Sequence, residues 1–532
     1  MRLDYKWQAA LITALGLFMA VLDNTIVSVA LPQMADSFHT DISTITWVAT
    51  AYFLAQAAII PVTGYLSDRI GTKTVFLSAL AIFTIGSGLC AIAPSHTLLI
   101  GFRVLQGIGG GALFPTAFAI IFRVFPPAER GPASAIIGVP ILLAPAFGPT
   151  LGGYLTTTFD WHAIFTINLP IGVIAFTLAA IFLRGRAADN VAMGGEPAAS
   201  RRFDLLGLVL AMGGFTTLVY GITEAGSQGW DNRTVDIYLA IGAVLLIIFV
   251  IVELRSSDPV MDMRLFKNYT FTISNVLMWA LGAFLFGSLF LLPYFFELVQ
   301  GLTPLSAGEI LISQGLAAAV STVIAGSLYN RVGPRIMGFV GFALVTAGTW
   351  GFAHMDVATT GQSLQIWLIL RGLGLGFINI PLQTLALSVV SNRAMARASS
   401  LVNVTRQVAS ALGVAVLTSY LTQSATAHGN DIAAAFQQRP PTGIAAACLS
   451  ASGVTVPTPQ ALQAHMGAIK TCVENHAFTM GLNDTFFFVM LACGICAVLA
   501  LIVGRDPAVQ AAKAAAARGE EVAPREPVFV GE

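Results

Sequence analysis

An acid lies in the middle of the first apolar stretch of the chain. Residues 11–32 read LITALGLFMAVLDNTIVSVALP, in which Asp23 is the acidic side chain. About 20 apolar residues are enough to cross a bilayer as a helix. A carboxylate at that depth costs a few kcal/mol, so it usually faces a cavity or a partner. Asp23 could therefore bind a proton or cation, or it could brace a neighbouring helix, and the sequence leaves both roles open.

A second charged side chain lies inside another apolar segment, LIGFRVLQGIGGGALFP. The spacing of Arg103, Gln106, Gly107, Gly110 and Phe114 places these five residues on one face of a helix. An arginine within a membrane span must meet an acid, backbone carbonyls or water. The acid of the first stretch is a candidate partner of this arginine, or a competitor for the same proton. A purely structural hydrogen bond between two helices is the alternative.

Glycines and charges share a short loop after the second apolar segment, GYLSDRIGTKTVF. Gly64 and Gly71 permit a tight turn with close packing. Asp68, Arg69 and Lys73 accompany them at the expected membrane edge. Ordinary membrane topology explains the two cations, since cytoplasmic loops are rich in Lys and Arg, but it does not explain the acid. The stretch GTKT lacks the Gly-Lys-Ser/Thr order of a P-loop, so we expect no ATP site.

Small residues and prolines form a stripe in the segment GVPILLAPAFGPTLGGYL. Small side chains let helices approach closely, and prolines permit a helix to bend. We therefore expect packing and hinge positions on this segment. They are Gly138, Pro145, Gly148, Pro149, Gly152 and Gly153.

Composition indicates a membrane protein that crosses the bilayer many times. Of the 532 residues, 56% are hydrophobic and 10% are charged, whereas soluble domains carry about 25% charged residues. Lys+Arg and Asp+Glu are both 27, so no net charge suggests nucleic acid as a partner. The apolar segments that we predict as spans are 8–32, 44–66, 74–93, 97–122, 131–155, 162–184, 203–223, 236–254, 270–298, 305–328, 334–354, 364–389, 395–423 and 483–504.

The distribution of positive charge predicts the orientation of these fourteen segments. If the N-terminus is cytoplasmic, the outer loops hold three of the basic residues, Arg233, Arg439 and Lys470, and the cytoplasmic segments hold most of the others. Basic residues concentrate on the cytoplasmic side of membrane proteins. The sequence therefore predicts that both termini are cytoplasmic.

An internal repeat divides the chain. The loop GYLSDRIGTKTVF recurs after the tenth segment as GSLYNRVGPRIMG. Two segments after each loop, an arginine lies inside an apolar segment: Arg103 in the fourth and Arg371 in the twelfth. Repeated halves around a central path are a transporter architecture. We predict an all-α membrane protein with two six-helix halves. The parts are an N-terminal half (1–190), two inserted helices (191–260), a C-terminal half (261–504) with an outer loop (424–482), and a cytoplasmic tail (505–532).

These motifs together resemble the major facilitator superfamily, specifically its fourteen-span drug:proton antiporters of the EmrB/QacA type. The resemblance covers nearly the whole chain and includes LDNTIVSVALP in the first segment. It implies a proton-coupled multidrug exporter of lipophilic, cationic compounds in a bacterial inner membrane, driven by the proton gradient without a cofactor. It also implies a periplasmic adaptor and an outer-membrane channel as partners. A narrow-range exporter or uptake permease for one metabolite, antibiotic or siderophore is the alternative.

The resemblance also assigns roles to individual residues. It implies that Arg103 participates in proton transfer with Asp23. It implies that Asp68 docks against the other half and holds the cytoplasmic side shut, as a latch. The glycine and proline stripe resembles a motif associated with export.

Several further residues are candidates for lining the substrate cavity. Aromatic side chains suit a lipophilic pocket, although lipid-facing aromatics are also common in spans. Glu309 also fits a capping box with Ser306, which would give it a structural role. Arg406 is a charge within a span and is expected to pair across helices. The candidates are Gln106, Phe114, Phe286, Phe290, Glu297, Glu309 and Arg406.

Two cysteines lie in the predicted outer loop. Cys448 and Cys472 are the cysteines outside the apolar segments. Disulfides persist in oxidising compartments, so we predict a bridge, with two unpaired thiols as the alternative. The chain shows neither a catalytic Ser/His/Asp set nor a metal-ligand cluster at membrane depth, and we predict neither an enzyme nor a metal site.

Overall fold

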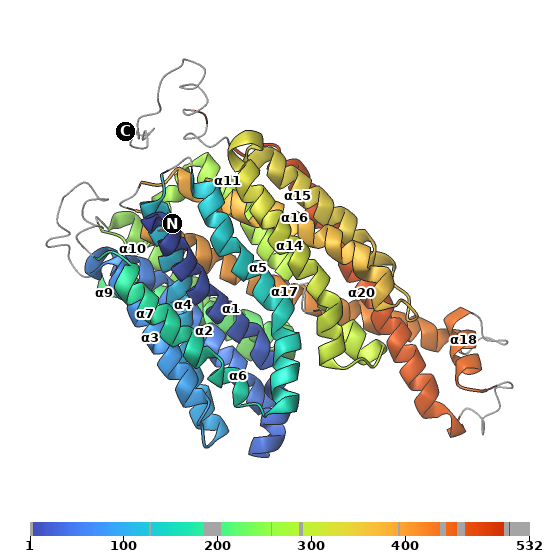
Figure 1. Ribbon diagram of the computed structural model, residues 1–532. Coiled ribbons are helices and arrows are strands. Elements are labelled where there is room, and N and C mark those ends of the chain that lie inside the picture. Colours follow the sequence, from blue (N-terminus) through green and yellow to red (C-terminus); the bar gives the residue numbers. More distant parts are fainter. Residues whose placement is uncertain are drawn as a thin grey trace.

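The computed structural model describes residues 4–126, 129–185, 204–256, 258–286, 291–391, 394–436, 443–454, 463–504 and 510. Within these ranges the chain is helical and contains no strand. Figure 1 shows long helices that lie roughly side by side and cross the molecule from end to end. The predicted tail, 505–532, falls outside the described residues apart from residue 510.

The first half of the chain supplies six long passes. Short connections join consecutive helices, so neighbours run in opposite directions. The elements are α1 (Tyr5–Phe38), α2 (Ile42–Ile70), α3 (Thr72–Cys90), α4 (His96–Val124), α5 (Arg130–Thr158), and the pair α6 (Ala163–Thr166) and α7 (Asn168–Phe182). Two further helices follow, α9 (Leu205–Gln228) and α10 (Arg233–Arg255).

The second half repeats this pattern with more irregular elements. It begins with η2 (Met263–Lys267), α11 (Tyr269–Ala280), η3 (Leu281–Phe286), α13 (Leu291–Tyr294) and η4 (Phe295–Val299). It continues with α14 (Pro304–Val332), α15 (Pro334–Trp350), η5 (Phe352–His354), α16 (Gly361–Ser388), α17 (Met395–Ala435), α18 (Gly443–Ala451) and α20 (Met466–Ala500).

Thirteen of the described helices are long and apolar enough to cross a membrane. The other predicted span, 270–298, is not one regular helix. It begins as α11, passes into the π-helical η3, and resumes as α13 and the π-helical η4. The apolar pattern predicted the length of this span but not its π-helical turns. Such turns within α-helices are frequent at functional sites.

The two halves meet along helix pairs that are distant in sequence. Helix α5 packs against α14 along its length, and α2 packs against α17. The inserted helices α9 and α10 pack against each other, and α9 also contacts both α2 and α17. The insertion therefore lies beside the seam between the halves. We call the end of the bundle where α1 begins and α10 ends the basic face, since Arg123, Arg255 and Arg335 lie there.

The predicted repeat has a backbone counterpart. Gly71 between α2 and α3 has a φ of 91°, and Gly333 between α14 and α15 has a φ of 87°. Residues with a Cβ atom rarely adopt such φ angles, so both turns depend on glycine. The two loops therefore share the conformation as well as the sequence motif.

The flanking helices extend into the segment 424–482, which we predicted as an outer loop. Helix α17 has 41 residues and α20 has 35. At 1.5 Å per residue each is longer than the roughly 30 Å apolar core of a bilayer. Both helices therefore project beyond the predicted spans, and α18 lies beside their ends (Figure 1).

Candidate transport sites

Asp23 is fully buried and accepts hydrogen bonds from three side chains of two other helices. Arg103 Nη1 donates to its Oδ2 at 2.5 Å. Gln106 Nε2 and Asn168 Nδ2 each donate to its Oδ1 at 2.8 Å. The exposed fraction is 0% for Asp23 and 1% for Arg103, so the pair is isolated from bulk water in this conformation. A buried ion pair with these additional donors satisfies the carboxylate that the apolar stretch would otherwise leave alone.

Arg103 has further partners that fix its guanidinium. Its Nε donates to the carbonyl of Val48 in α2 at 3.0 Å, and its Nη1 also donates to Gln106 Oε1 at 2.8 Å. The Tyr52 ring lies 4.0 Å from the guanidinium carbon, a cation–π distance. Of the two predicted relations between Arg103 and Asp23, the structure contains the direct ion pair.

Sequence reasoning missed Asn168 as a member of this group. It begins α7 and also donates to Ser87 Oγ at 3.1 Å, which links α1, α3 and α7. The available signal was a polar amide inside the apolar segment 162–184. A lone amide in a span is often a helix–helix hydrogen bond, so the type of residue alone did not select it.

Asp68 lies at the basic face and bridges the two halves. Its Oδ1 accepts from Arg123 Nη2 of α4 at 2.9 Å, and its Oδ2 accepts from Arg397 Nε of α17 at 2.9 Å. Arg397 Nη2 in turn donates to Asp258 Oδ1 at 2.7 Å, and its Nη1 donates to the carbonyl of Pro259 at 2.7 Å. The contact between halves that the resemblance implied for Asp68 is therefore present, with Arg397 as the partner.

The other residues of the loop motif support this contact in different ways. A Cβ placed on Gly64 would lie 2.7 Å from the Ala396 carbonyl oxygen, so the helices α2 and α17 meet backbone to backbone. Lys73 Nζ donates to the Ala180 carbonyl of α7 at 2.7 Å, within the N-terminal half. The Arg69 guanidinium lies 5.0 Å from the centre of the Tyr65 ring. These two cations hold the local structure, while Asp68 and Gly64 make the contact between halves.

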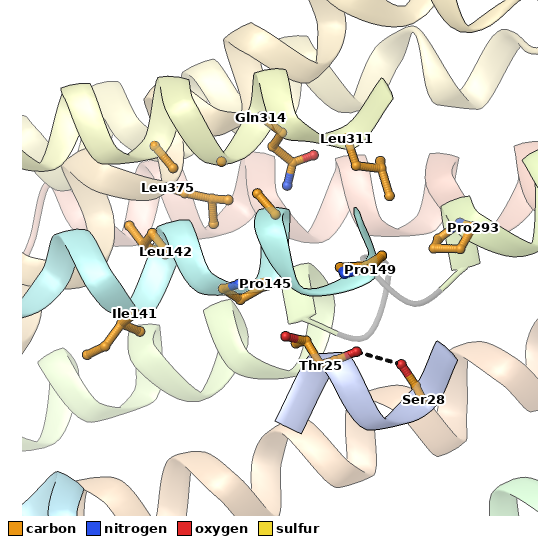
Figure 2. A pocket seen from close by; sticks show the side chains of 13 residues that line it. Thr25, Ser28, Ile141, Leu142, Pro145, Pro149, Pro293, Leu311, Gln314 and Leu375 are labelled. Atoms are coloured by element: carbon orange, nitrogen blue, oxygen red, sulfur yellow. Dashed lines mark hydrogen bonds between the residues drawn. The ribbon is translucent and has the colours of Figure 1, made fainter. Parts of the chain in front are cut away.

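A cavity lies between α1, α5, α14 and the broken segment, and Figure 2 shows its wall. Its volume is about 130 Å³, smaller than the roughly 300–1,000 Å³ of drug-sized pockets. Its polar groups are the side chains of Thr25, Ser28 and Gln314. This cavity would have to widen to hold a drug-sized molecule.

The predicted stripe of α5 contacts this cavity and the neighbouring helices. Pro145 and Pro149 line the cavity. A Cβ on Gly148 would lie 2.0 Å from Thr25 Oγ1 of α1, and one on Gly138 would lie 2.5 Å from Ile380 of α16. Gly152 faces Ile26 of α1, and Gly153 lies next to Leu305 of α14. The stripe therefore has the close packing that its residue types indicate.

The predicted cavity residues whose side chains the structure describes are not among those that line this cavity. Gln106 belongs to the Asp23 group, and Phe114 is half-buried against the main hydrophobic core. The side chain of Phe286 and the whole of Phe290 lie outside the described residues. Glu297 is half-buried in η4. Aromatic content did not distinguish cavity from core because both are apolar.

Two predictions about charged residues are wrong. Helix α14 begins at Pro304 with Thr303 as its N-cap, whose side chain accepts from Ser306 N, so Ser306 and Glu309 do not form a capping box. Proline suits the first helical position, so the helix begins at Pro304, before Ser306. Glu309 is exposed. Arg406 does not pair across helices among the described residues; its Nη2 donates to Asn403 Oδ1 on the same helix at 3.0 Å.

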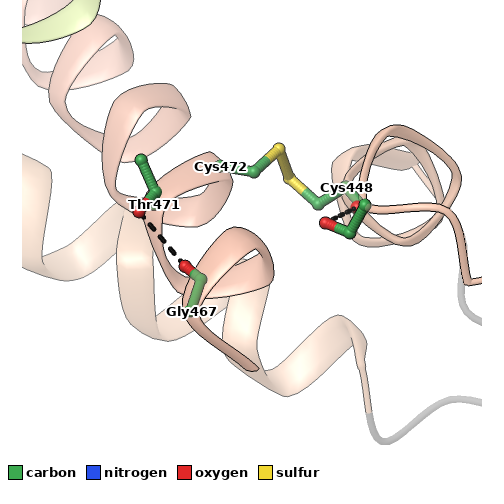
Figure 3. The surroundings of a disulfide bond; sticks show 5 residues. Cys448, Gly467, Thr471 and Cys472 are labelled. Carbon is green, nitrogen blue, oxygen red and sulfur yellow. Dashed lines mark hydrogen bonds between the residues drawn. A yellow bond between two sulfur atoms is a disulfide. The ribbon is translucent and has the colours of Figure 1, made fainter. Parts of the chain in front are cut away.

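Cys448 and Cys472 form a disulfide in the structure (Figure 3). The bridge joins α18 to α20, with Cα atoms 5.7 Å apart, beside a small apolar cluster of Leu449, Val454 and Ile469. His476 lies close enough for the three side chains to resemble a metal-binding group. Metal ligation needs thiolates, and both sulfurs are bonded to each other here.

We expect Cys448→Ser to loosen this outer segment, because the bridge closes a loop with a sequence separation of 24. In the chain-entropy model such a closure contributes about 3 kcal/mol. Protease cleavage between α18 and α20 should become faster in right-side-out membranes, and Cys493→Ser, at a free buried thiol, is the control. Mass spectrometry of alkylated, non-reduced peptides measures the bridge directly. Recovery of both thiols free from oxidised membranes would contradict it.

Comparisons with known proteins agree with this architecture. The sequence profile of the Major Facilitator Superfamily matches residues 13–414. A multidrug resistance protein B homolog of Mycobacterium tuberculosis H37Rv is 38% identical over 417 residues, which cover 77% of this chain and 75% of that protein. Multidrug export protein EmrB of Escherichia coli K12 is 32% identical over 417 residues, 78% of this chain and 80% of that protein. The crystal structure of the human organic anion transporter MFSD10 (TETRAN) matches with a TM-score of 0.59 at 14% identity, covering 92% of this chain and all of that one, which bears on the fold alone.

Proposed function

Because this chain belongs to the major facilitator superfamily, we propose that it exports lipophilic small molecules in exchange for protons by alternating access. The observation that carries the proposal is the buried pair of Asp23 and Arg103 inside the N-terminal half. A carboxylate at membrane depth that can exchange an arginine for a proton is suited to couple proton movement to a change of conformation. Relatives named as multidrug transporters support export of drug-like compounds.

In the proposed cycle, the structure corresponds to a state whose basic face is closed. Asp68 and Arg397 join the halves there, and Ser399 Oγ donates to the Pro115 carbonyl of α4 nearby at 3.1 Å. We assign the basic face to the cytoplasm on the distribution of Lys and Arg. Opening this face would admit substrate, and the proton gradient would drive its release on the other side. The membrane would be the bacterial inner membrane.

Transport in proteoliposomes tests the proposal. The purified chain should expel a lipophilic dye from the compartment that contacts the basic face, and only with an imposed pH gradient. Collapse of the gradient should stop transport. Equal transport with and without the gradient, or net uptake toward the basic face, would instead favour the alternative of a permease.

The charge of the substrate is a separate prediction. The resemblance implied cationic compounds, yet the described wall of the cavity in Figure 2 contains no carboxylate. Arg406 is half-buried in α17, and its Nη1 has no hydrogen-bond partner among the described residues. If cationic substrates pass Arg406 when the path between the halves opens, Arg406→Gln should raise their transport by removing like charge, tenfold for about 1.4 kcal/mol. A loss confined to anionic dyes would show that Arg406 binds an anion and would favour the narrow-range alternative.

We further propose that the chain works with a periplasmic adaptor and an outer-membrane channel in a double-membraned cell. The projecting ends of α17 and α20, with α18 bridged to α20, offer a surface outside the membrane for such an adaptor. Cross-linking in native membranes should capture an adaptor through these elements. Full resistance conferred by the chain in cells that lack such genes would argue against the assembly.

A further inference from the structure

Arg397 contacts two carboxylates that belong to different parts of the transporter. Asp68 is on α2, in the N-terminal half, and it meets Arg397 Nε at 2.9 Å. Asp258 is on the linker after α10, and it meets Arg397 Nη2 at 2.7 Å. The exposed fraction of the side chain is 8% for Asp68, 8% for Arg397 and 15% for Asp258, so water screens neither contact well. One guanidinium therefore donates to both acids in the closed state.

The linker that carries Asp258 connects the insertion to the C-terminal half. It continues directly into η2 and α11, and α11 packs against α16 and α17. The Pro259 carbonyl accepts a second bond from Arg397, and Glu253 Oε2 accepts from Met261 N at 3.1 Å, which braces the linker against α10. The contact between Arg397 and Asp258 thus joins the end of the insertion to the C-terminal half, whereas the contact with Asp68 joins the two halves.

The inserted helices are attached to α17 at the opposite face as well. Trp230, which follows α9, donates from Nε1 to Ser419 Oγ of α17 at 2.9 Å. A Cβ on Gly226 would lie 3.2 Å from Ala415 Cα, so α9 and α17 are in close contact there. The insertion therefore contacts α17 near both of its ends, and it also contacts α2, where Asp204 N donates to Tyr65 Oη at 3.4 Å.

From this arrangement we propose that Asp258 is a positioning residue that retains Arg397 when the basic face opens. Opening separates Asp68 from Arg397, and a buried guanidinium without a carboxylate is costly. Asp258 and the Pro259 carbonyl remain with Arg397 and keep its charge satisfied. The insertion thus lowers the cost of opening, and the two acids bias the transporter in opposite directions. This inference rests on the alternating access of the proposed function.

Opposite shifts on neutralising the two acids are the test. Asp68→Asn should favour the state open at the basic face, and Asp258→Asn should favour the closed state. Reporter cysteines in the reconstituted full chain read the two states. Ser134 is buried on α5, between Gly131, which contacts α14, and Gly138, which contacts α16, so a Ser134→Cys thiol reports opening of the basic face. Ser28 is exposed in the closed state, so a Ser28→Cys thiol reports that state.

We expect Asp258→Asn to lower maleimide labelling at Ser134→Cys by about fivefold, for about 1 kcal/mol lost from the open state. Asp68→Asn should raise it, and the double variant should lie between the two. Asp262→Asn is the matched control, since that acid accepts from Arg264 N on the same linker. An Asp258→Asn shift in the same direction as Asp68→Asn, or no larger than that of Asp262→Asn, would overturn the proposal. Labelling needs no substrate, so a failure of the export activity is a separate result.

A second measurement avoids the charged residues. Trp230→Cys and Ser419→Cys, joined by a short bifunctional thiol reagent, would tie the insertion permanently to α17. The bridged protein should keep its exchange between the two labelling states, because in the proposed cycle the insertion and α17 move together. Arrest by this bridge would contradict the proposal even if Asp258→Asn fails to reach the membrane.

Discussion

Asp23→Asn is expected to reduce proton-driven efflux to the background level while the protein still inserts in the membrane. The amide keeps the shape and one acceptor for Arg103, but it cannot take up a proton. The buried guanidinium also loses its counter-charge, and breaking such a pair costs about 3–5 kcal/mol. Dye efflux from proteoliposomes with an imposed pH gradient measures the loss, and thermal unfolding in detergent measures the stability.

Asn168→Ala is the control for this experiment. It removes one hydrogen bond to the same carboxylate without a change of charge, a loss of about 1.5–3 kcal/mol. It should therefore unfold at a slightly lower temperature yet keep its dependence on the pH gradient. If Asp23→Asn transports at the rate of the parent protein with equal expression, Asp23 has the bracing role that the sequence left open.

Membrane physics explains why the Asp23 group was accessible from sequence. Charged residues in apolar spans are rare and must be satisfied, so the sequence alone indicated Asp23 and Arg103 as candidate partners. Helix periodicity placed Gln106 on the face of Arg103, one turn away, but we predicted that it lines the cavity and not that it binds Asp23. Asn168 was missed, since an uncharged amide is tolerated in a span with or without a function.

The same argument fails at the membrane edge. Arg123, Arg397 and Asp258 lie near helix ends, where charges are common and cost little, so their types carry no information about pairing. Only the packing of α2 against α17 brings Asp68 to Arg397. The α14 cap and the broken segment after α11 were missed for a related reason. The local sequence pattern gave the approximate limits of both elements. Two candidate N-caps of α14, Thr303 and Ser306, differ in capping free energy by less than tertiary contacts contribute, so the pattern could not choose between them.

Gly64→Val is expected to prevent closure of the basic face and to stop transport. In the closed state a Cβ at this position would lie 2.7 Å from both the Ala396 carbonyl oxygen and Ser400 Oγ, and 2.9 Å from Arg397 Cα. Two of these atoms are backbone, so the neighbours cannot avoid the added methyl groups by rotating a side chain. Overpacking of this kind costs about 1–3 kcal/mol, roughly a 5- to 150-fold shift toward the open state.

The steric origin of this effect is checked by the same substitution elsewhere. Gly101 lies in α4, and a Cβ there meets no atom within 4 Å, so Gly101→Val should leave transport and labelling unchanged. Gly64→Val should raise maleimide labelling at Ser134→Cys and lower transport even with Asp68 intact, because the ion pair with Arg397 can form only after α2 and α17 meet. Labelling equal to that of the parent protein would mean that the backbone contact at Gly64 is not what closes this face, and that the charges of Asp68 and Arg397 suffice without it.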